Sequence, residues 1–296
     1  ALSDEDAAFA VLSSIGLQAV RLAKPEFSET FLVIGLGLIG LLTAQILKAN
    51  GCRVLAYDID ASKCKIARQL GITTLNFTKA KVAIDWCISE NHGKGIDGVI
   101  ITASTDSTSP VEIAANVSRK RGRIILVGVT GLDIKRDWFY KKELTFQVSC
   151  SYGSERYDED YQTSNTEYPI GIFRWTTKRN FQSVLEAILD GKIKTELLKS
   201  NEYFFEDAVE AFENLHKNKS NIGILLKYKN TVDVNEKKIK LHKIVDYSKQ
   251  NSSYENPVIG FIGAGNYAKS FLIPAFAKTK AKLSTILITK ILTKLS

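Results

Sequence analysis

The sequence is short of the residues on which metal and disulfide chemistry depends. Its 296 residues include four cysteines, three histidines and no methionine, and no two cysteines form a CxxC pair. Cysteine-rich zinc sites usually show such pairs, and disulfide scaffolds carry more cysteine in a shorter chain. The histidines (His92, His216 and His242) stand in polar contexts without a partner at ligand spacing. The sequence therefore predicts no metal site and reduced thiols, as in a cytoplasmic protein.

A long uninterrupted apolar run is also missing. The longest candidate, "FLVIGLGLIGLLTAQIL" at 31–47, is interrupted by three glycines and by Gln45. It approaches the roughly 20 residues that a membrane helix needs. A strand-like "RVLAYDID" follows at 53–60, as expected for a globular α/β protein. We therefore predict no membrane partner.

Arginine is absent from the last part of the chain. Residues 227–296 contain thirteen lysines and four acids, which gives 13 − 4 = +9, so residues 1–226 carry 8 − 9 = −1 of the net charge of +8. Proteins that read nucleic acids favour arginine for its two-pronged hydrogen bonding. The excess charge is better explained by a solvated, lysine-rich linker, and no nucleic-acid partner is predicted.

The pattern that is present is an alternation of apolar strands and amphipathic helices. A helix over 4–23 precedes strands at 30–37, 53–60, 98–104 and 122–129, with helices between them. Fully apolar strands separated by helices predict an α/β fold with a doubly wound parallel sheet, a Rossmann domain over 1–150. An aromatic loop and return segment follow at 151–228, then a lysine-rich linker at 229–256. The start of a second, incomplete Rossmann unit is predicted at 257–296.

A glycine-rich turn stands where the first strand meets its helix. "VIGLGLIG" supplies Gly35, Gly37 and Gly40 in GxGxxG spacing. In a dinucleotide site the first glycine allows the tight turn, the second lets the backbone approach the pyrophosphate, and the third allows close helix packing. Asp58 ends the second strand, 58 − 40 = 18 residues further on. An acid at that distance accepts hydrogen bonds from the adenosine ribose and repels a 2′-phosphate, so the sequence predicts NAD rather than NADP.

Residues 1–228 resemble the cofactor domain of the medium-chain, zinc-type alcohol and polyol dehydrogenases. The resemblance is carried by "DEDAAF", "VIGLGLIG", "AYDIDASKCKIARQLG", "GIDGVIITAS" and "RGRIILVGV". It implies contact with the pyrophosphate at Gly37, Leu38 and Ile39, and with the ribose at Asp58 and Lys63. It also implies that the strand ends at Thr102, Ala103, Val127 and Gly128 lie beside the ribose and nicotinamide.

In this family the zinc ligands belong to a catalytic domain that lies mostly before the cofactor domain. No matching Cys, His and Glu set occurs in this sequence, so the catalytic residues stay unassigned. Zinc is expected only if a segment upstream of Ala1 supplies its ligands. The chain alone is accordingly not expected to turn over an alcohol or a sugar.

The loop from Cys150 to Arg179 interleaves six aromatic residues with arginines. Such a loop can stack a base or a sugar ring, or it can pack on its own aromatic side chains. "SCSYG…RYD…YPIG…RWT" resembles a subgroup of these dehydrogenases in which a second oxidoreductase is fused behind, often in polysaccharide synthesis. Ser154 and Glu155 replace the glycine and proline usual in that subgroup.

A second glycine turn lies near the end of the sequence. "VIGFIGAGNYAKSFLIPAF" at 258–276 resembles the first strand, turn and helix of the family that includes glucose–fructose oxidoreductase and inositol dehydrogenase. Gly263, Gly265 and Ala268 occupy the small-residue positions, with Asn266 and Tyr267 between them. No acid follows Glu255, so no ribose-reading carboxylate is predicted for this second site.

These observations favour the NAD(H)-binding portion of an oxidoreductase that moves hydride to or from an alcohol, polyol or sugar-derived hydroxyl. Its partner is a small-molecule substrate, and a homo-oligomer is possible. Two alternatives stay open, a nucleotide-binding module without turnover and a zinc-independent reductase of the quinone type. Zinc ligands upstream of Ala1 would favour the dehydrogenase, and a zinc measurement would separate it from the reductase.

Overall fold

The computed structural model describes residues 2–159, 161, 167–217, 221–228, 257–262, 265 and 267–287. The chain divides into two units, Ala1–Asn230 and Thr231–Ser296, which are described separately below. The predicted linker at 229–256 lies outside the described residues.

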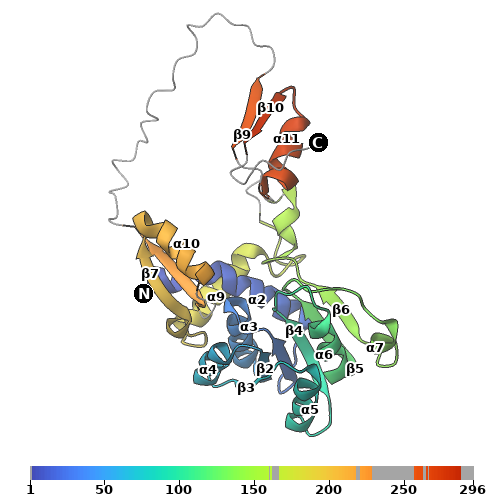
Figure 1. Cartoon of the computed structure of the whole chain (residues 1–296). Helices are drawn as coiled ribbons and strands as arrows, with labels where there is room; N and C mark the ends of the chain where they lie inside the picture. Colours follow the sequence, from blue (N-terminus) through green and yellow to red (C-terminus); the bar gives the residue numbers. More distant parts are fainter. Residues whose placement is uncertain are drawn as a thin grey trace, which may run out of the picture. The chain divides into compact units, whose positions relative to one another are not determined.

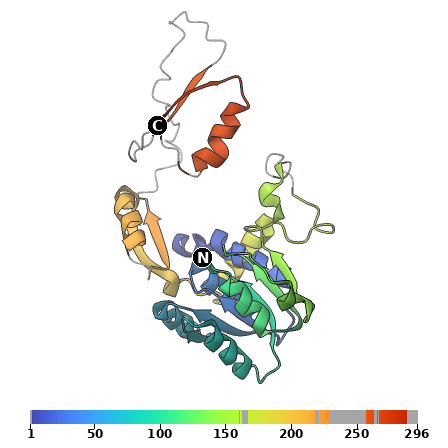
Figure 2. The same ribbon diagram turned by 45° about the vertical axis from the view of Figure 1, so that its right-hand side comes forward.

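The first unit is built on a six-stranded parallel sheet (Figures 1 and 2). The strands run in the order β3-β2-β1-β4-β5-β6. They are β1 (Thr30–Ile34), β2 (Arg53–Asp58), β3 (Thr73–Asn76), β4 (Ile96–Ile101), β5 (Ser118–Leu126) and β6 (Thr145–Val148). The chain adds strands on one side of β1 and then returns to add β4 on the other side. The predicted doubly wound sheet is therefore confirmed, with the reversal of strand order between β1 and β4.

Helices cover both faces of this sheet because alternate side chains of each strand point to opposite faces. On β1, Phe31 and Val33 pack in one apolar cluster, while Leu32 and Ile34 pack in the other. The first cluster includes α2 (Ala10–Ala23), α3 (Leu38–Ala49) and α4 (Ala61–Gln69). The second includes α5 (Ala80–Glu90), α6 (Ser109–Val117) and α7 (Arg136–Tyr140).

The leading helix differs from the expectation for residues 4–23. It consists of α1 (Asp4–Ala7), capped by the Ser3 side chain, and then α2, with a break at Ala8 and Phe9. Phe9 is 3% exposed and belongs to the first apolar cluster. Ala8 and Phe9 keep right-handed helical dihedral angles, so the break is a local interruption of the helix.

After β6, the rest of the first unit includes a separate two-stranded sheet of β7 and β8. Helix α9 packs on α2, and α10 packs beside the small sheet. The elements are η1 (Ser154–Tyr157), α9 (Thr177–Leu189), η2 (Glu196–Leu198), β7 (Lys199–Phe204), η3 (Phe205–Asp207), α10 (Ala208–Lys217) and β8 (Gly223–Lys227).

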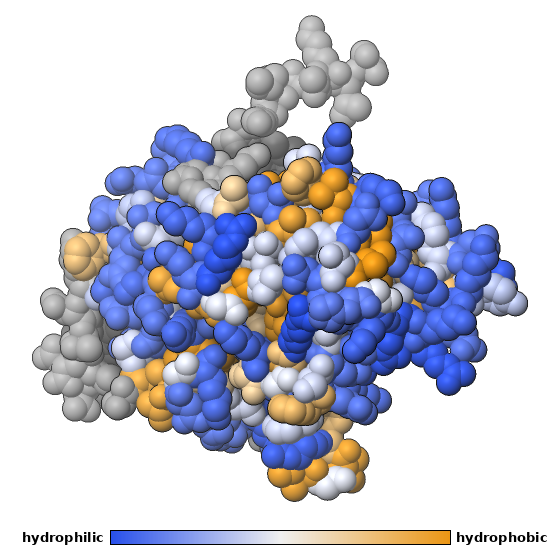
Figure 3. All heavy atoms as spheres, turned by 90° about the horizontal axis from the view of Figure 1, so that it is seen from below, coloured by the Kyte–Doolittle hydropathy of each residue, from blue (hydrophilic) through white to orange (hydrophobic). Residues whose placement is uncertain are grey.

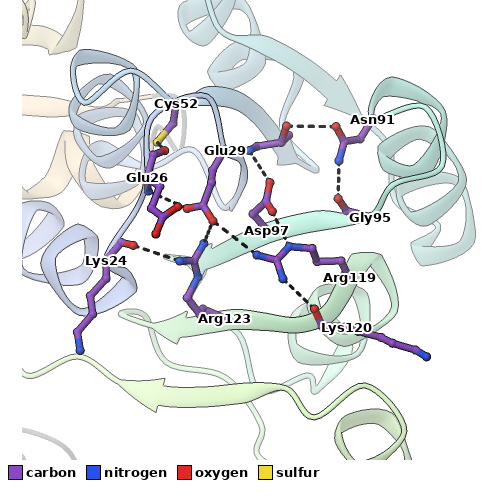
Figure 4. Close-up of polar contacts among 11 residues, drawn as sticks. Lys24, Glu26, Glu29, Cys52, Asn91, Gly95, Asp97, Arg119, Lys120 and Arg123 are labelled. Atoms are coloured by element: carbon purple, nitrogen blue, oxygen red, sulfur yellow. Dashed lines mark hydrogen bonds and ion pairs between the residues drawn. The ribbon is translucent and has the colours of Figure 1, made fainter.

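A polar network joins the starts of the central strands, at the amino edge of the sheet (Figure 4). Asp97 accepts hydrogen bonds from the Thr30 backbone at 2.8 Å and from Arg119 Nε at 2.5 Å. The Glu29 carboxylate pairs with Arg123 at 2.5 Å and with Arg119 at 3.6 Å. These side chains link β1, β4 and β5 at the edge opposite to the glycine turn.

The second unit contains one parallel pair of strands around a helical segment. Strands β9 (Val258–Ile262) and β10 (Lys282–Leu287) pair, and η5 (Ala268–Leu272) and α11 (Ile273–Ala277) lie between them in sequence. This is a strand–helix–strand unit, the first step of a Rossmann sheet. The sequence predicted β9 and the helix but not β10.

No helix in the described part of the chain is long and apolar enough to cross a membrane. Figure 3 shows one face of the molecule, where apolar side chains reach the surface in separate patches among polar ones.

Candidate functional site

The glycine turn lies at the carboxyl edge of the sheet, at the point where strand order reverses. It follows β1, and the Thr102–Ala103 turn follows β4, the neighbouring strand in the sheet. In open α/β sheets, ligands bind in the crevice outside the carboxyl ends of the strands at such a reversal. The predicted site residues of these two segments therefore meet at the place where the fold offers a ligand site.

Two of the three glycines are required by close backbone contacts. Gly35 has φ +97°, and a Cβ on it would lie 2.6 Å from the Ala103 amide nitrogen. A Cβ on Gly40 would lie 1.9 Å from the Gly35 carbonyl oxygen. Neither position can accept a side chain without moving the backbone. These glycines therefore shape the turn, whatever it binds.

Gly37 is different, because the space around it is open. A Cβ there would have no described atom within 4 Å, and its φ of −67° is one that any residue adopts. Gly37 is the N-cap of α3, and no side chain caps this helix. The first N–H groups of a helix have no intrahelical acceptor, so those of Leu38 and Ile39 are available to an anion. The structure leaves room at Gly37 that a side chain would fill and a phosphate could use.

Asp58, at the end of β2, accepts a hydrogen bond from the backbone of the glycine turn. One carboxylate oxygen accepts a hydrogen bond from the Leu36 backbone at 2.6 Å, and the other accepts one from the Asp60 backbone at 2.8 Å. The side chain is 8% exposed. An ionised carboxylate offers about four acceptor positions, so two accepted bonds leave capacity for ribose hydroxyls. The role of the Leu36 N–H was not predicted, because in GxGxxG this residue is one of the unspecified positions.

Thr102 holds the turn from β4. Its hydroxyl donates to the Gly35 carbonyl at 2.7 Å, and it also lies 3.2 Å from the Ile34 carbonyl. The backbone N–H groups of Thr102 and Ala103 both reach the Ile34 oxygen, at 2.8 and 3.1 Å. Thr102 therefore fixes the backbone of the turn, which is a positioning role that the sequence did not predict.

The segment that follows β5 contacts the backbone at the end of β4. A Cβ on Gly128 would lie 2.0 Å from the Ala103 carbonyl oxygen. The N–H groups of Val127 and Gly128 both donate to the Ile101 oxygen, at 2.8 and 3.0 Å. The ends of β1, β4 and β5 are thus in direct backbone contact, as expected if one extended ligand crosses all three.

Lys63 lies apart from these contacts. It is half-buried on α4, near Asp60. Asp60 is the N-cap of α4, and hydrogen bonds from Ser62 and the Lys63 charge hold its pKa below the ordinary range. The structure links Lys63 to the end of β2 through Asp60, with no described contact to the glycine turn.

The aromatic loop packs largely on its own side chains. Tyr168 lies between Tyr161 and Phe173, with ring centroids 4.9 and 5.6 Å away. Trp175 has guanidinium carbons of Arg21 and Arg174 at 3.2 and 3.9 Å from its ring centroid. These contacts use the ring faces that a base or sugar would need, so they favour the packed loop over the stacking platform.

Glu155 has a structural role in this loop. It is 2% exposed, and its carboxylate accepts the Thr177 backbone N–H at 3.0 Å at the start of α9. A carboxylate is favourable at a helix N-terminus, since the helix dipole is positive there. The Glu155 carboxylate therefore stabilises the first turn of α9.

The second glycine turn is described only in part. Gly263 and Asn266 lie outside the described residues. Gly265 is exposed, with no atom within 4 Å of a Cβ, while Tyr267 is 67% exposed and Ala268 begins η5. The turn joins a strand to a helix as predicted, and its ligand stays a prediction.

No group of three or more His, Cys, Asp or Glu side chains in the described part of the chain could hold a metal ion. Of the cysteines, Cys52, Cys64 and Cys87 are buried and Cys150 is partly exposed, all as free thiols. The described residues therefore do not fit a zinc site.

The chain has relatives of known sequence and structure. Residues 39–166 match the zinc-binding dehydrogenase family. The chain is 28% identical to D-xylulose reductase from Scheffersomyces stipitis over 216 residues, 72% of this chain and 54% of the relative. These matches support the predicted resemblance of the first part of the chain to zinc-type alcohol and polyol dehydrogenases.

Solved structures confirm the Rossmann fold. A 2R,3R-butanediol dehydrogenase from Bacillus subtilis superposes with a TM-score of 0.63 at 24% identity, covering 77% of this chain and 59% of that structure. An E. coli alcohol dehydrogenase complexed with NADH superposes with a TM-score of 0.61 at 19% identity, covering 76% and 59%. The chain thus spans little more than half the length of the relatives it matches.

Proposed function

We propose that the first unit is the NAD(H)-binding portion of an oxidoreductase that transfers hydride to or from an alcohol, polyol or sugar-derived hydroxyl. The observation that carries the proposal is the open space at Gly37, at the uncapped start of α3 and beside the buried Asp58 carboxylate. The similarity to alcohol and polyol dehydrogenases supports the substrate class.

In this proposal the pyrophosphate lies against the N–H groups of Leu38 and Ile39, where the helix dipole favours negative charge. Asp58 accepts the ribose hydroxyls, and its charge disfavours a 2′-phosphate. Thr102, Ala103 and Gly128 line the nicotinamide side. When bound, the nicotinamide accepts or returns the hydride, and the protein orients it.

Zinc enters the proposal only through residues outside this sequence. The alcohol oxygen must be polarised and its proton removed during hydride transfer, and no described residue can be assigned that role. The further proposal of a fused second oxidoreductase, in polysaccharide synthesis, rests only on the resemblances of the loop at 149–176 and of residues 258–276.

Calorimetric titration of the chain with NADH and NADPH tests the cofactor site. We expect NADH to bind at least about tenfold more tightly, since a 2′-phosphate beside a buried carboxylate costs more than about 1.4 kcal/mol. The variant Asp58→Ala should reduce the ratio of NADH affinity to NADPH affinity. Equal binding of the two cofactors by the unaltered chain would contradict the role of Asp58, and no binding of either would contradict the proposed function.

A further inference from the structure

A surface hollow lies between α2 and α3, away from the glycine turn. It has a volume of about 270 Å³ and is lined by Leu17, Val20, Arg21, Pro25, Ile46, Ala49 and Asn50. Gly37 is the N-cap of α3 and Asn50 is its C-cap. A helix of twelve residues is about 18 Å long, so the hollow and the cofactor site lie at opposite ends of α3.

Arg21 is the charged residue in this lining, and its position is fixed by two contacts. Its guanidinium carbon lies 3.2 Å from the Trp175 ring centroid, and its Nε donates to Asn180 Oδ1 at 2.7 Å. Asn180 is fully buried and also donates to the Tyr152 carbonyl at 3.3 Å. Arg21 therefore reaches from the lining of the hollow to Trp175 and Asn180, and these contacts fix its guanidinium before any ligand arrives.

The positive charge at this place is not balanced. Arg174 also stacks on Trp175, at 3.9 Å, and among the described residues neither arginine forms an ion pair. Burial, and then repulsion by Arg174, lower the pKa of Arg21 to about 10. Two unneutralised guanidiniums at one ring raise the local positive potential, and an anion would relieve it.

We propose that this hollow is a binding site for a small carboxylate that carries an apolar body. The carboxylate accepts hydrogen bonds from the free N–H groups of Arg21, whose planar fork matches its two oxygens. The apolar body covers Leu17, Val20 and Ile46. The volume is slightly below the range of drug-sized pockets, so the ligand is a small one such as a medium-chain fatty acid. An inorganic anion would leave the apolar lining in water.

Calorimetric titration with octanoate tests the site. We expect saturable binding in the millimolar range or tighter, with no matching heat for the neutral 1-octanol or for acetate, which lacks the apolar body. Arg21→Met keeps an apolar side chain and removes the charge, so it should weaken octanoate binding by about tenfold or more. Arg174→Met should weaken it less.

Arg136→Met is the matched control, because Arg136 stacks on Tyr140 at 3.8 Å but does not line the hollow. It should leave octanoate binding within about twofold of the unaltered chain. Thermal unfolding checks that Arg21→Met is folded, and Arg21→Lys, which keeps the charge without the fork, should retain part of the affinity. The proposal is overturned if octanoate does not saturate, if octanol binds equally, or if Arg21→Met and Arg136→Met behave alike.

Discussion

The two edges of the six-stranded sheet are held together in different ways. At the amino edge, the carboxylates of Glu29 and Asp97 meet the guanidiniums of Arg119 and Arg123. At the carboxyl edge, the ends of β1, β4 and β5 meet through backbone atoms. The Asp58 carboxylate at this edge accepts backbone N–H groups rather than pairing with a charged side chain.

This difference separates a structural edge from the edge that we propose binds the cofactor. The amino-edge charges neutralise one another, so little capacity is left for a ligand. Backbone contacts at the carboxyl edge leave the first N–H groups of α3 unused and the space at Gly37 open. Substitutions at the amino edge should therefore change stability, and those at the carboxyl edge should change ligand affinity.

Gly37→Val should show the largest effect. The new side chain has space in the ligand-free chain, so the midpoint of thermal unfolding should fall only slightly, by the cost of a poorer N-cap. It would occupy the place of the pyrophosphate, so NADH affinity in calorimetry should fall by about a hundredfold or more. Gly171→Val is the control, since Gly171 also has no atom within 4 Å of a Cβ. Equal NADH affinity for the two variants would mean that the turn is not the binding site.

Glu29→Gln should reduce the stability of the chain without changing its affinity for NADH. Glu29 is 13% exposed and contacts both Arg119 and Arg123. Removing its charge leaves two guanidiniums without their shared partner, so the free energy of unfolding in urea should fall by about 2 kcal/mol. NADH affinity should be unchanged. Glu90→Gln is the control, because its pair with Arg53 is exposed and should contribute less than about 1 kcal/mol. A loss of NADH affinity in Glu29→Gln would show that the two edges are coupled.

The sequence predicted the carboxyl edge better than the amino edge. Gly35, Gly37, Gly40 and Asp58 follow a spacing set by the dinucleotide itself, so the pattern is visible in a single chain. The contacts of Glu29 with Arg119 and Arg123 span 90 or more residues and have no characteristic spacing. The stack of Arg21 on Trp175 joins residues that are 175 − 21 = 154 apart in sequence.

Secondary structure was predictable where periodicity was clear. Strands β1, β2, β4 and β5 of the main sheet were predicted because their apolar runs are bounded by glycine or by polar residues. Strand β3 was not predicted, because "TTLN" is short and lacks an apolar run. Strand β10 was missed, since "KLSTIL" continues into an apolar tail without a turn signal. The break before α2 was missed because helical spacing continues through Phe9.

Thr102→Val should have a smaller effect at the carboxyl edge. Valine keeps the shape but cannot donate to the Gly35 carbonyl, and one hydrogen bond is worth about 1 kcal/mol. NADH affinity should fall by roughly fivefold to tenfold as the turn loses its support. Thr102→Ser retains the hydroxyl and should restore most of the affinity. If serine and valine variants bind NADH alike, the hydroxyl does not position the turn.

The smallest effect at neutral pH concerns a group at neither edge. Cys87 is fully buried on α5, and burial raises the pKa of its thiol from 9.0 to about 12. Between these values the unfolded chain loses a proton that the folded chain keeps, so stability falls as pH rises, by at most about 1.4 kcal/mol per pH unit. Below about pH 9 the thiol is protonated in both states and contributes no pH dependence. Cys87→Ala removes this proton but not those of the buried Cys52 and Cys64.

Urea unfolding of the unaltered chain and Cys87→Ala at pH 7.5, 9 and 10.5 measures this contribution. The alanine variant should be less stable at pH 7.5, because it leaves a cavity. The difference between the two chains should shrink at pH 10.5, since only the unaltered chain then loses the thiol contribution. A difference that is constant across these pH values would show that the thiol is solvated in the folded chain. NADH affinity per folded molecule should be the same for both chains at each pH, because Cys87 lies in the apolar cluster of α5 and α6 and not among the strand ends of the proposed site.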